Sequence, residues 1–517
     1  MDQRAPANKW LVTLTVMIPT FIEILDMTVV NVSLNHIQGS LNAGLDEVTW
    51  ILTSYLVSNA IVIPMSGWLA SRIGRRRYLL ISISLFTVSS LLCGSATSLE
   101  MLLLFRVLQG IGGGGLQPLS NAILLETFPR EQHGTAMAVF GMGIVFAPIL
   151  GPILGGWITD NWNWRWIFYI NGPVGILSVM LVLLFIKDPA YLRNTIRKID
   201  YWGIALLVVG IGSLQLVLDR GERLDWMASP FIQRMSVLSA ACLIFFIWQE
   251  LRTESPVVDL RVFRDRSFAL GNIVMFCGFF AFFASLVLLP VYVQKLMGYT
   301  SWWAGWVLAP GGVASLFMMP IAGKLLQKTD ARKLLFIGLS LNAYALVLMS
   351  HFNLEADFFS ILWPRVIQGL GLGFFFVPLA TITVGFIPRE RMGNATAVFS
   401  LLRNLGGSFG VALLTTQLAR RAQFHHHRLA ELFSPTYPPF QFSLDRLVPW
   451  MQGQFGTGQE QGLQKAMGII YGELNRQAFM KAFNDCFFLD VLFFLIPLPL
   501  VFIMRRAGRG VEGPMGH

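Results

Sequence analysis

The stretch PREQHGTAMAVF, residues 129–140, recurs as PRERMGNATAVF at residues 388–399, with eight of twelve positions identical. The same offset of 259 residues separates Arg106-Val-Leu-Gln-Gly110 from Arg365-Val-Ile-Gln-Gly369. In both copies an arginine enters a long apolar run, and the run ends at a Pro-Arg-Glu turn. Chance similarity between apolar runs does not produce these polar residues in the same order. The repeat therefore predicts a duplicated bundle of membrane helices, arranged as parallel repeats.

The composition of the chain is typical of a membrane protein. Hydrophobic residues make up 54% of the sequence and charged residues only 13%, whereas a soluble domain carries about 25% charged residues. The apolar residues come in runs of about 20, the length that crosses a hydrocarbon core as a helix. The alternation expected of a transmembrane barrel is missing from these runs. We therefore expect an all-α integral membrane protein, because helices pair their own backbone polar groups in lipid.

Short polar segments divide the chain into fourteen apolar runs. Six runs fall in each half of the repeat, and two extra runs lie between the halves. We expect a six-helix bundle in residues 1–187, two linker helices in 188–267 and a second six-helix bundle in 268–517. The expected spans are 11–31, 48–70, 78–97, 100–126, 133–158, 166–187, 201–219, 231–251, 268–293, 301–323, 333–351, 358–385, 393–417 and 484–505.

Lysine and arginine are concentrated on one side of the predicted membrane. That side holds 24 of the 39 basic residues, and the short loops opposite carry only Arg165, Arg220, Arg223 and Lys295. The excess predicts that this side, with both termini, is cytoplasmic. We then expect segment 418–483 to be a long extracytoplasmic loop with short amphipathic stretches. The basic cytoplasmic segments are 72–77, 187–198, 252–266, 324–333 and 505–509.

Several classes of function are excluded by what the sequence lacks. The net charge of +10 comes from short clusters between spans, so we expect no nucleic-acid partner. Glycines 112–115 lie within a span and lack the Lys and Ser/Thr of a phosphate loop, which excludes an ATP-driven pump. The histidines at 425–427 could bind a metal, but they are more typical of a solvated loop. We find no nucleophile with a matching base, and we expect neither an enzyme nor a cofactor.

Two acidic residues lie inside the first span, which contains the stretch LDMTVVNVSL at residues 25–34. Asp26 is about 15 residues into this span, so it lies about 22 Å along the helix. An ionised carboxylate at such a depth is costly unless it is neutralised or paired. Glu23 lies on the same helical face, where the two acids would repel each other. We interpret both as proton carriers; a capping acid is the plainer alternative for Asp26.

A buried cation is expected in the fourth span, in the stretch Leu102-Leu-Leu-Phe-Arg106-Val-Leu-Gln109-Gly110. Arg106 lies about 10 Å into the membrane, and an arginine cannot shed its proton and needs a partner there. Asp26 lies at a similar depth, so the two residues are expected to pair, either for transport or only for structure. Arg365 copies Arg106, but the ninth span offers no acid that matches Asp26.

Glycine is combined with arginine or proline in two further stretches. Gly67-Trp-Leu-Ala-Ser-Arg-Ile-Gly-Arg-Arg-Arg77 follows the second span, and Ala147-Pro-Ile-Leu-Gly-Pro-Ile-Leu-Gly-Gly156 lies in the fifth. Glycines at four-residue spacing allow close helix contact, and prolines bend a helix. Retention of positive charge on the cytoplasmic side would explain the arginines but not the spacing of the glycines. Generic helix packing would explain the glycines but not the two prolines. The residues of interest are Gly67, Arg72, Gly74, Arg75, Arg76, Pro148, Gly151, Pro152, Gly155, Gly156 and Arg365, and a gating role for them is what a family resemblance implies.

Together these stretches resemble the major facilitator superfamily, and within it the fourteen-span drug:proton antiporters of the EmrB type. Residues 25–34 resemble the Leu-Asp-x-Thr-Val-Val-Asn-Val-Ala segment of that subfamily, and residues 102–110 resemble its proton-linked motif. Residues 147–156 resemble the Gly-Pro-x-x-Gly-Gly motif of antiporters. Residues 67–77 resemble the superfamily's gating loop but depart from it at Ser71, where the family usually has Asp. A gating salt bridge from that position is therefore absent or built differently.

The resemblance implies a major facilitator fold of two six-helix bundles plus two central helices, in the bacterial inner membrane. It implies proton-coupled efflux of hydrophobic or amphipathic drugs by alternating access, with protons exchanged at the carboxyls of Asp26 and Glu23 and with Arg106 as their proton-coupling partner. The substrate would be taken up from the cytoplasm into a pocket between the bundles that is rich in Phe, Met and Trp. The candidate pocket residues are Asn31, Gln109, Met275, Phe276, Phe279, Phe283, Phe375 and Arg403.

The same resemblance implies an EmrA-like periplasmic adaptor and a TolC-like outer-membrane channel as partners. Segment 418–483 is a candidate contact for them, and a passive tether is the alternative. One rival function is export of a defined metabolite, such as a siderophore or a fatty acid. A rival from another class is a membrane scaffold or receptor that transports nothing, which would need no charged residues in the first and fourth spans.

Overall fold

The fold comes from a computed structural model and is helical throughout the residues it describes, with no strand among them. Fourteen stretches in these residues are helical, long and apolar enough to cross a membrane. This confirms the prediction of fourteen spans in an all-α membrane protein. Most of the basic segment 187–198 and of the basic tail 505–509 lies outside the described residues. These are 8–188, 199–431, 437–455 and 458–505.

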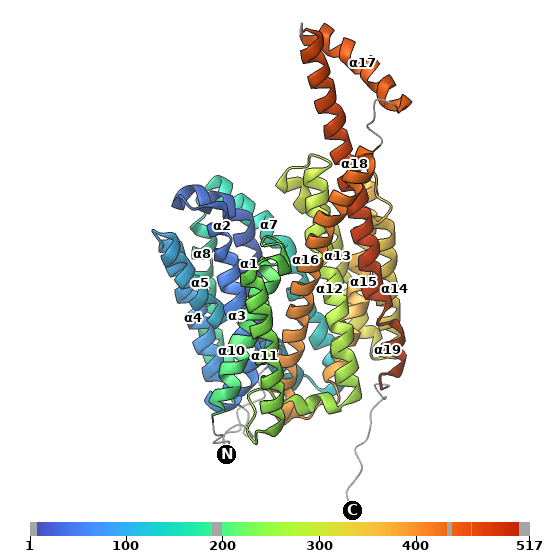
Figure 1. The fold of residues 1–517 in the computed structure, drawn as a ribbon. Helices are drawn as coiled ribbons and strands as arrows, with labels where there is room; N and C mark the ends of the chain where they lie inside the picture. Colours follow the sequence, from blue (N-terminus) through green and yellow to red (C-terminus); the bar gives the residue numbers. More distant parts are fainter. Residues whose placement is uncertain (1–7, 189–198, 432–436, 456–457, 506–517) are drawn as a thin grey trace, which may run out of the picture.

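The first six spans form one group of helices, coloured from blue to teal in Figure 1. The fourth span is broken into two helices at Gly114 and Gly115, the end of the glycine run. Within the group, the first helix packs against α7 and α9. The group consists of α1 (Lys9–Leu41), α2 (Leu45–Val48), α3 (Trp50–Ile73), α4 (Arg75–Ser95), α5 (Leu99–Gly113), α6 (Leu116–Thr127), α7 (His133–Asn161), α8 (Trp166–Tyr169) and α9 (Asn171–Phe185).

The last six spans form a second group, coloured from yellow-green to red in Figure 1. The helix that opens this group packs against α16 and α18, as α1 packs against later helices of the first group. The group consists of α12 (Arg266–Lys295), α13 (Ser301–Leu325), α14 (Ala331–Met349), α15 (Phe358–Val384), α16 (Met392–Ala430), α17 (Pro438–Phe455), α18 (Gln459–Leu495) and α19 (Leu498–Ile503).

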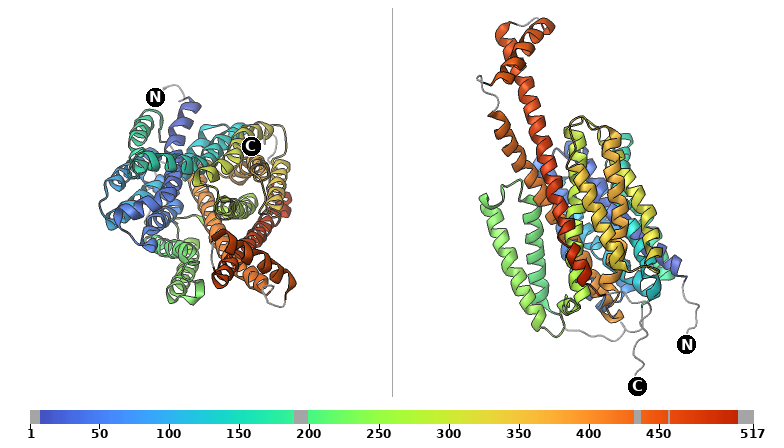
Figure 2. Two further views of the ribbon diagram at one scale, coloured as in Figure 1. Left: turned by 90° about the horizontal axis from the view of Figure 1, so that it is seen from above. Right: turned by 90° about the vertical axis from the view of Figure 1, so that its right-hand side faces the viewer.

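Two linker helices, α10 (Tyr201–Arg220) and α11 (Pro230–Arg252), pack on each other at the side of the bundle (Figure 2). The first of them also lies against α3 and α16, one helix from each group. Its Gln215 side chain donates a hydrogen bond of 3.1 Å to Ser408 on α16. The second carries a row of exposed large apolar side chains, as expected of a helix that faces lipid. These include Val237, Ile244, Phe245 and Trp248.

The segment between the last two spans forms a helical projection, which corrects the expectation of a loop. Helices α16 and α18 continue past the other helices, and α17 packs against α18. Figures 1 and 2 show the projection standing clear of the rest of the molecule. Residues 418–430 and 459–483 are rich in Ala, Leu, Gln, Arg and Glu, all strong helix formers. With 39 and 37 residues, α16 and α18 are therefore much longer than the roughly 20 residues that a span needs.

The three histidines lie on α16, so the expectation that they occupy a loop is wrong. His425 Nε2 is 2.8 Å from Asp485 Oδ2 on α18, and Arg421 Nε is 3.4 Å from the same oxygen. Only 17% of the His425 side chain is exposed. Among the described residues no three His, Cys, Asp or Glu side chains gather in a way that could hold a metal ion. These contacts instead join the two long helices where the projection begins.

The described chain begins and ends at one face of the bundle, which we call the terminal face (Figure 1). The two groups meet closely there. A Cβ atom at Gly67 would lie 2.7 Å from the Gly393 carbonyl oxygen, and one at Gly134 would lie 3.1 Å from that of Gly323. Toward the opposite, distal face the ribbons of the two groups diverge in Figure 1. The structure therefore has the two groups in contact at the terminal face.

Candidate functional site

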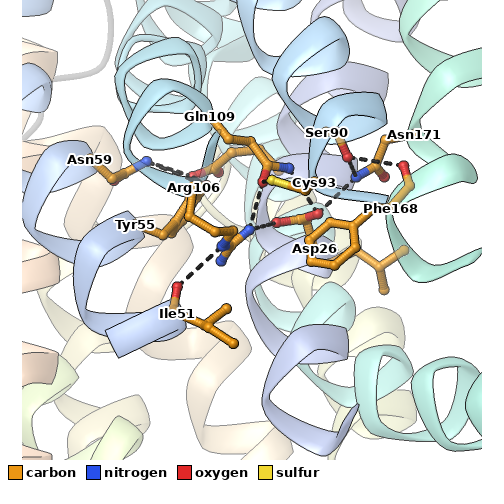
Figure 3. Close-up of polar contacts among 12 residues, drawn as sticks. Asp26, Ile51, Tyr55, Asn59, Ser90, Cys93, Arg106, Gln109, Phe168 and Asn171 are labelled. Atoms are coloured by element: carbon orange, nitrogen blue, oxygen red, sulfur yellow. Dashed lines mark hydrogen bonds and ion pairs between the residues drawn. The ribbon is translucent and has the colours of Figure 1, made fainter. Parts of the chain in front are cut away.

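The predicted ion pair between Asp26 and Arg106 is present in the first group of helices (Figure 3). Arg106 Nη1 lies 2.7 Å from Asp26 Oδ2, and neither side chain is exposed. Asp26 comes from the middle of α1 and Arg106 from the middle of α5. Two opposite charges that face each other neutralise the site, which explains how both can be buried in a membrane span.

Neutral side chains complete the hydrogen bonding of Asp26. Its Oδ1 accepts from Gln109 Nε2 at 3.0 Å and from Asn171 Nδ2 at 2.7 Å. Gln109 Oε1 in turn accepts from Arg106 Nη1 at 2.7 Å, which closes a ring of three residues. Asn171 also donates to Ser90 Oγ on α4 at 2.8 Å. Asp26 thus joins α1, α5 and α9 through one ion pair and two hydrogen bonds from amides.

The guanidinium of Arg106 is further held by the second span. Its Nε donates to the Ile51 carbonyl at 3.2 Å, and its Cζ lies 4.2 Å from the centre of the Tyr55 ring. A desolvated cation above an aromatic face gains about 2 kcal/mol. The ring of Phe168 lies 5.8 Å away on another side. Figure 3 shows these groups around the ion pair, which is enclosed by the first group of helices.

Glu23, one helical turn before Asp26, has a separate and uncharged set of partners. Its Oε1 accepts from the Tyr55 hydroxyl and from Asn59 Nδ2, each at 3.1 Å. Its Oε2 accepts from Gln117 Nε2 on α6 at 2.6 Å. The residue is only 1% exposed. Glu23 is therefore a buried carboxyl whose hydrogen-bond donors are all neutral, in contrast to Asp26.

One further contact joins Glu23 to the second group of helices. The amide of Gln117 that donates to Glu23 also accepts, through its Oε1, a hydrogen bond from Arg403 Nη2 on α16. Arg403 is buried, and it also donates to Asn404 Oδ1 at 3.3 Å. The chain of contacts from Glu23 through Gln117 to Arg403 therefore crosses the interface between the two groups.

The glycines of α7 allow it to lie directly against α1 next to these acids. A Cβ at Gly151 would be 1.9 Å from Thr28 Oγ1, and one at Gly155 would be 3.0 Å from Val29. Gly156 differs, because nothing lies within 4 Å of the corresponding position. Pro148 and Pro152 both lie within the continuous helix α7. The Gly-Pro stretch thus fixes the packing of the part of α1 that follows Asp26.

The predicted gating loop is a tight turn between α3 and α4. Gly74 has φ +95°, a left-handed conformation that favours glycine, and Asp188 occupies the space a side chain would need. Arg75 forms a two-pronged ion pair with Glu126 at the end of α6, with Nη2 2.7 Å from Oε1. Arg76 Nη2 donates to the Leu183 carbonyl at 2.7 Å, and Arg72 lies over the Trp68 ring. The loop therefore binds the ends of α4, α6 and α9.

The position that departs from the family pattern, Ser71, makes a local bond only. Its hydroxyl donates to the Trp68 carbonyl at 2.8 Å. Beside it lies a cavity of about 420 Å³ between the two groups, covered by the segment before α12. In that segment Asp259 exchanges two backbone–side chain hydrogen bonds of 2.9 and 3.0 Å with Asn394. Ser71, Asp259 and Asn394 all line this cavity.

The aromatic candidates for a substrate pocket are packed together in the second group. Met275, Phe279 and Phe375 are fully buried, whereas Phe276 and Phe283 are half-buried. The Phe279 ring centre lies 5.8 Å from that of Phe283 and 6.2 Å from that of Phe375. In this state these side chains form a core. The remaining candidates lie elsewhere: Asn31 is exposed on α1, Gln109 belongs to the Asp26 network and Arg403 contacts Gln117.

The two repeated groups of helices, with a buried ion pair in the first, can be compared with known proteins. The model of the Major Facilitator Superfamily matches residues 16–411. The chain belongs to the Major Facilitator Superfamily. This major facilitator chain is 38% identical to the multidrug export protein EmrB of Escherichia coli K12, over 100% of both chains. It is 37% identical to the fatty acid resistance protein FarB of Neisseria gonorrhoeae, over 97% of both chains.

Solved structures support the fold of the major facilitator chain. The human organic anion transporter MFSD10 superimposes with a TM-score of 0.61, over 96% of this chain and 99% of that protein. The two sequences are only 14% identical, so the likeness concerns the fold alone. Members of this family are transporters rather than enzymes, which agrees with the expectation from the sequence.

Four neutral residues of the site were not among the predicted residues. Tyr55, Asn59 and Gln117 hold Glu23, and Asn171 holds Asp26. Each is a polar side chain within or at the edge of an apolar span, where an unpaired amide or hydroxyl is costly. A search of the spans for amides would have marked Asn59, Gln117 and Asn171. The tyrosine carries no such signal, because tyrosines are common at the ends of spans.

Proposed function

We propose that this protein is a proton-coupled multidrug efflux transporter of the inner membrane. The observation that carries the proposal is a pair of buried carboxyls on α1, within a chain 38% identical over its full length to a multidrug export protein. Ionisable groups inside membrane spans mark ion or proton pathways by default. The proton gradient and the membrane potential, about 2.3 kcal/mol per charge per 100 mV, would drive export.

Glu23 is the better candidate for the group that exchanges its proton. Asp26 faces a guanidinium at 2.7 Å, so a proton gained by Asp26 would leave Arg106 as a buried cation without its ionic partner. Glu23 has only neutral donors, so a protonated Glu23 leaves no unpaired charge at that position. We assign Asp26 and Arg106 to positioning α1 against α5. Proton loss from Glu23 on substrate binding would then strengthen the polar chain to Arg403 in the second group.

The contact of the two groups at the terminal face supports a mechanism of alternating access. We propose that residues 1–187 and 268–517 move as two bundles, with residues 188–267 as the linker. The groups touch at the terminal face, which the excess of basic residues assigns to the cytoplasm. In this assignment the structure is closed toward the cytoplasm. Opening it would separate Gly67 from Gly393 and would expose the interface beside Arg403 to substrate from the cytoplasm.

The helical projection is the proposed contact for partner proteins. With both termini in the cytoplasm, the projection would stand in the periplasm. Its outer surface carries exposed apolar residues on both helices, among them Phe442, Trp450, Met467 and Tyr471. Large exposed apolar side chains on a segment that stands clear of the spans suit a contact with another protein. We propose that it binds an EmrA-like adaptor, which connects to a TolC-like channel. Replacement of α17 by a Gly-Ser linker should abolish co-purification with a co-expressed adaptor and leave the yield of the transporter unchanged.

Export of a fatty acid is the second candidate function. It is favoured by the identity of 37% to the fatty acid resistance protein FarB, which is close to the identity to EmrB. Competition separates the two functions. A medium-chain fatty acid should inhibit dye export if both use one site, and should not if only cationic or neutral drugs are exported.

The test of the proposed function is proton-driven transport in inverted membrane vesicles. Vesicles with wild-type protein should accumulate a lipophilic dye when the interior is acidified, and an uncoupler should abolish the accumulation. Glu23→Gln should lose this dependence on the gradient. Glu355→Gln, which neutralises an exposed acid, is the matched control and should transport as wild type does. Gradient-driven accumulation that is equal in the Glu23→Gln vesicles would exclude the proposed coupling.

A further inference from the structure

The second group of helices contains a copy of the Asp26 site that lacks its carboxylate. Arg365 Nη1 donates to Gln368 Oε1, as Arg106 does to Gln109. Gln368 Nε2 then donates to Ser285 Oγ at 2.9 Å, whereas Gln109 Nε2 donates to the carboxylate of Asp26. The offset of 259 residues that relates Arg106 to Arg365 also relates Asp26 to Ser285. A serine therefore stands where the first repeat has an acid.

This replacement leaves the positive charge of Arg365 without an acidic partner among the described residues. Arg365 is 2% exposed, and its Nε has no hydrogen-bond acceptor. The ring of Phe282 lies 5.9 Å from its guanidinium. An arginine keeps its charge at any pH of interest, and an uncompensated charge at the centre of a span costs about 3 kcal/mol. In the first repeat the same cost is offset by the facing carboxylate.

A small space lies beside this guanidinium, at the interface between the two groups. Arg365, Gln368 and Gly311 line it from the second group, and Ile149 of α7 lines it from the first. Its volume is about 10 Å³, room for one group the size of a water molecule. A Cβ at Gly311 would lie 3.1 Å from Arg365 Nε and would fill the approach to it. Glycine at this position leaves the space beside this buried nitrogen unfilled.

We propose that Arg365 and Gln368 form a binding site for a small monovalent anion, with Ser285 beside Gln368 at the position of the missing acid. The anion is either a free halide, which suits the small space, or the carboxylate head group of an amphipathic substrate, which would enter when the two groups of helices separate. In both cases it supplies the negative charge that Asp26 supplies in the first repeat. Arginine suits this role because its planar fork of donors matches a carboxylate. Anion binding is a property separate from proton-coupled export and is measured without transport.

The test uses the purified full-length protein in a neutral detergent and a halide-free sulfate buffer. Thermal unfolding is followed while bromide replaces sulfate at constant ionic strength, because a ligand that binds only the folded state raises the unfolding midpoint. We expect a saturable rise for wild type. Arg365→Gln should weaken the apparent affinity by at least about tenfold. Arg223→Gln, which removes the same charge from an exposed site, should leave the affinity unchanged.

A second variant tests the repeat argument directly. Ser285→Asp restores the missing carboxylate and should both abolish the bromide response and raise the midpoint measured without halide. A second titration with octanoate, and with octanamide as its neutral counterpart, separates the two sources of the anion. Octanoate that displaces bromide identifies a carboxylate head group, whereas a bromide response that octanoate leaves unchanged identifies a free halide. The proposal is overturned if wild type shows no saturable response to either anion, or if both Ser285→Asp and Arg365→Gln retain it.

Discussion

Arg403 and Gln117 are joined by a buried hydrogen bond across the interface between the two groups of helices. Gln117 is a neutral amide with a donor and an acceptor, so it can satisfy Arg403 with one end and Glu23 with the other. This places a single side chain between a candidate proton carrier and the opposite bundle. A change in the protonation of Glu23 alters what Gln117 can accept and donate. We therefore propose that Gln117 links proton exchange at Glu23 to the movement of the two bundles.

Substitution of Gln117 by leucine should separate proton exchange from transport. Glu23 loses its shortest hydrogen bond and Arg403 loses a buried partner, each at a cost of about 1–3 kcal/mol. We expect gradient-driven dye export to fall at least about tenfold, as 1.4 kcal/mol corresponds to that factor. Gln215→Leu is the control, since it removes a hydrogen bond between α10 and α16 outside this chain. Equal losses in both variants would contradict the assigned role.

The ion pair between Asp26 and Arg106 should be necessary mainly for stability of the first bundle. Removal of one partner leaves a buried unpaired charge and should cost about 3–5 kcal/mol. Asp26→Asn and Arg106→Gln should therefore each lower the midpoint of thermal unfolding in detergent. The double variant carries no net charge at the site, and its midpoint should lie above that of Arg106→Gln or Asp26→Asn alone. Losses that simply add would show that the two charges do not interact.

Glycines 151 and 156 should differ sharply in their tolerance of a methyl group. Gly151→Ala places a Cβ atom against Thr28 on α1, and overpacking of this kind costs about 1–3 kcal/mol. Gly156→Ala meets nothing within 4 Å and should leave stability and export unchanged. Both are measured by thermal unfolding and dye export. Thr28→Gly should restore part of the loss in Gly151→Ala, and a failure to restore any would point to a cause other than this contact.

The pair between Arg75 and Glu126 should tolerate exchange of its charges. Arg75→Glu alone places two acids together at the terminal face and should reduce export strongly. Arg75→Glu combined with Glu126→Arg restores opposite charges and should recover a substantial part of the activity. The measurement is dye export normalised to the amount of transporter in the membrane. An exchanged pair that is no better than Arg75→Glu alone would mean that orientation, rather than charge, matters at this position.

Much of the fold is predictable from the sequence because each span is a long apolar run. The pairing of Asp26 with Arg106 is predictable as well, since both depths follow from the rise of a helix and an arginine in lipid needs an acid. The projection is not, because Ala, Leu, Gln and Glu continue a helix beyond the membrane without an apolar signal. A polar segment between two spans looks like a loop when only hydropathy is considered.

The partners of Glu23 and the incomplete copy of the site around Arg365 could be identified only from the structure. Asn59 and Gln117 come from different spans, and their meeting depends on how the helices rotate about their axes. The repeat itself makes Ser285 the position equivalent to Asp26. Only the hydrogen bond from Gln368 to Ser285 shows that this serine takes the place of the acid in the second group. The aromatic candidates of α12 illustrate the opposite case. Their periodicity is clear in the sequence, and in this state most of them form a packed core.

The most direct test of the account is proton release on substrate binding to the purified transporter. In weakly buffered detergent solution, addition of a saturating drug should release about one proton for each wild-type transporter, read with a soluble pH indicator. The account predicts that Glu23→Gln binds the drug and releases none, while Glu355→Gln releases as much as wild type. Proton release that is undiminished in Glu23→Gln would contradict the claim that this carboxyl exchanges its proton for substrate.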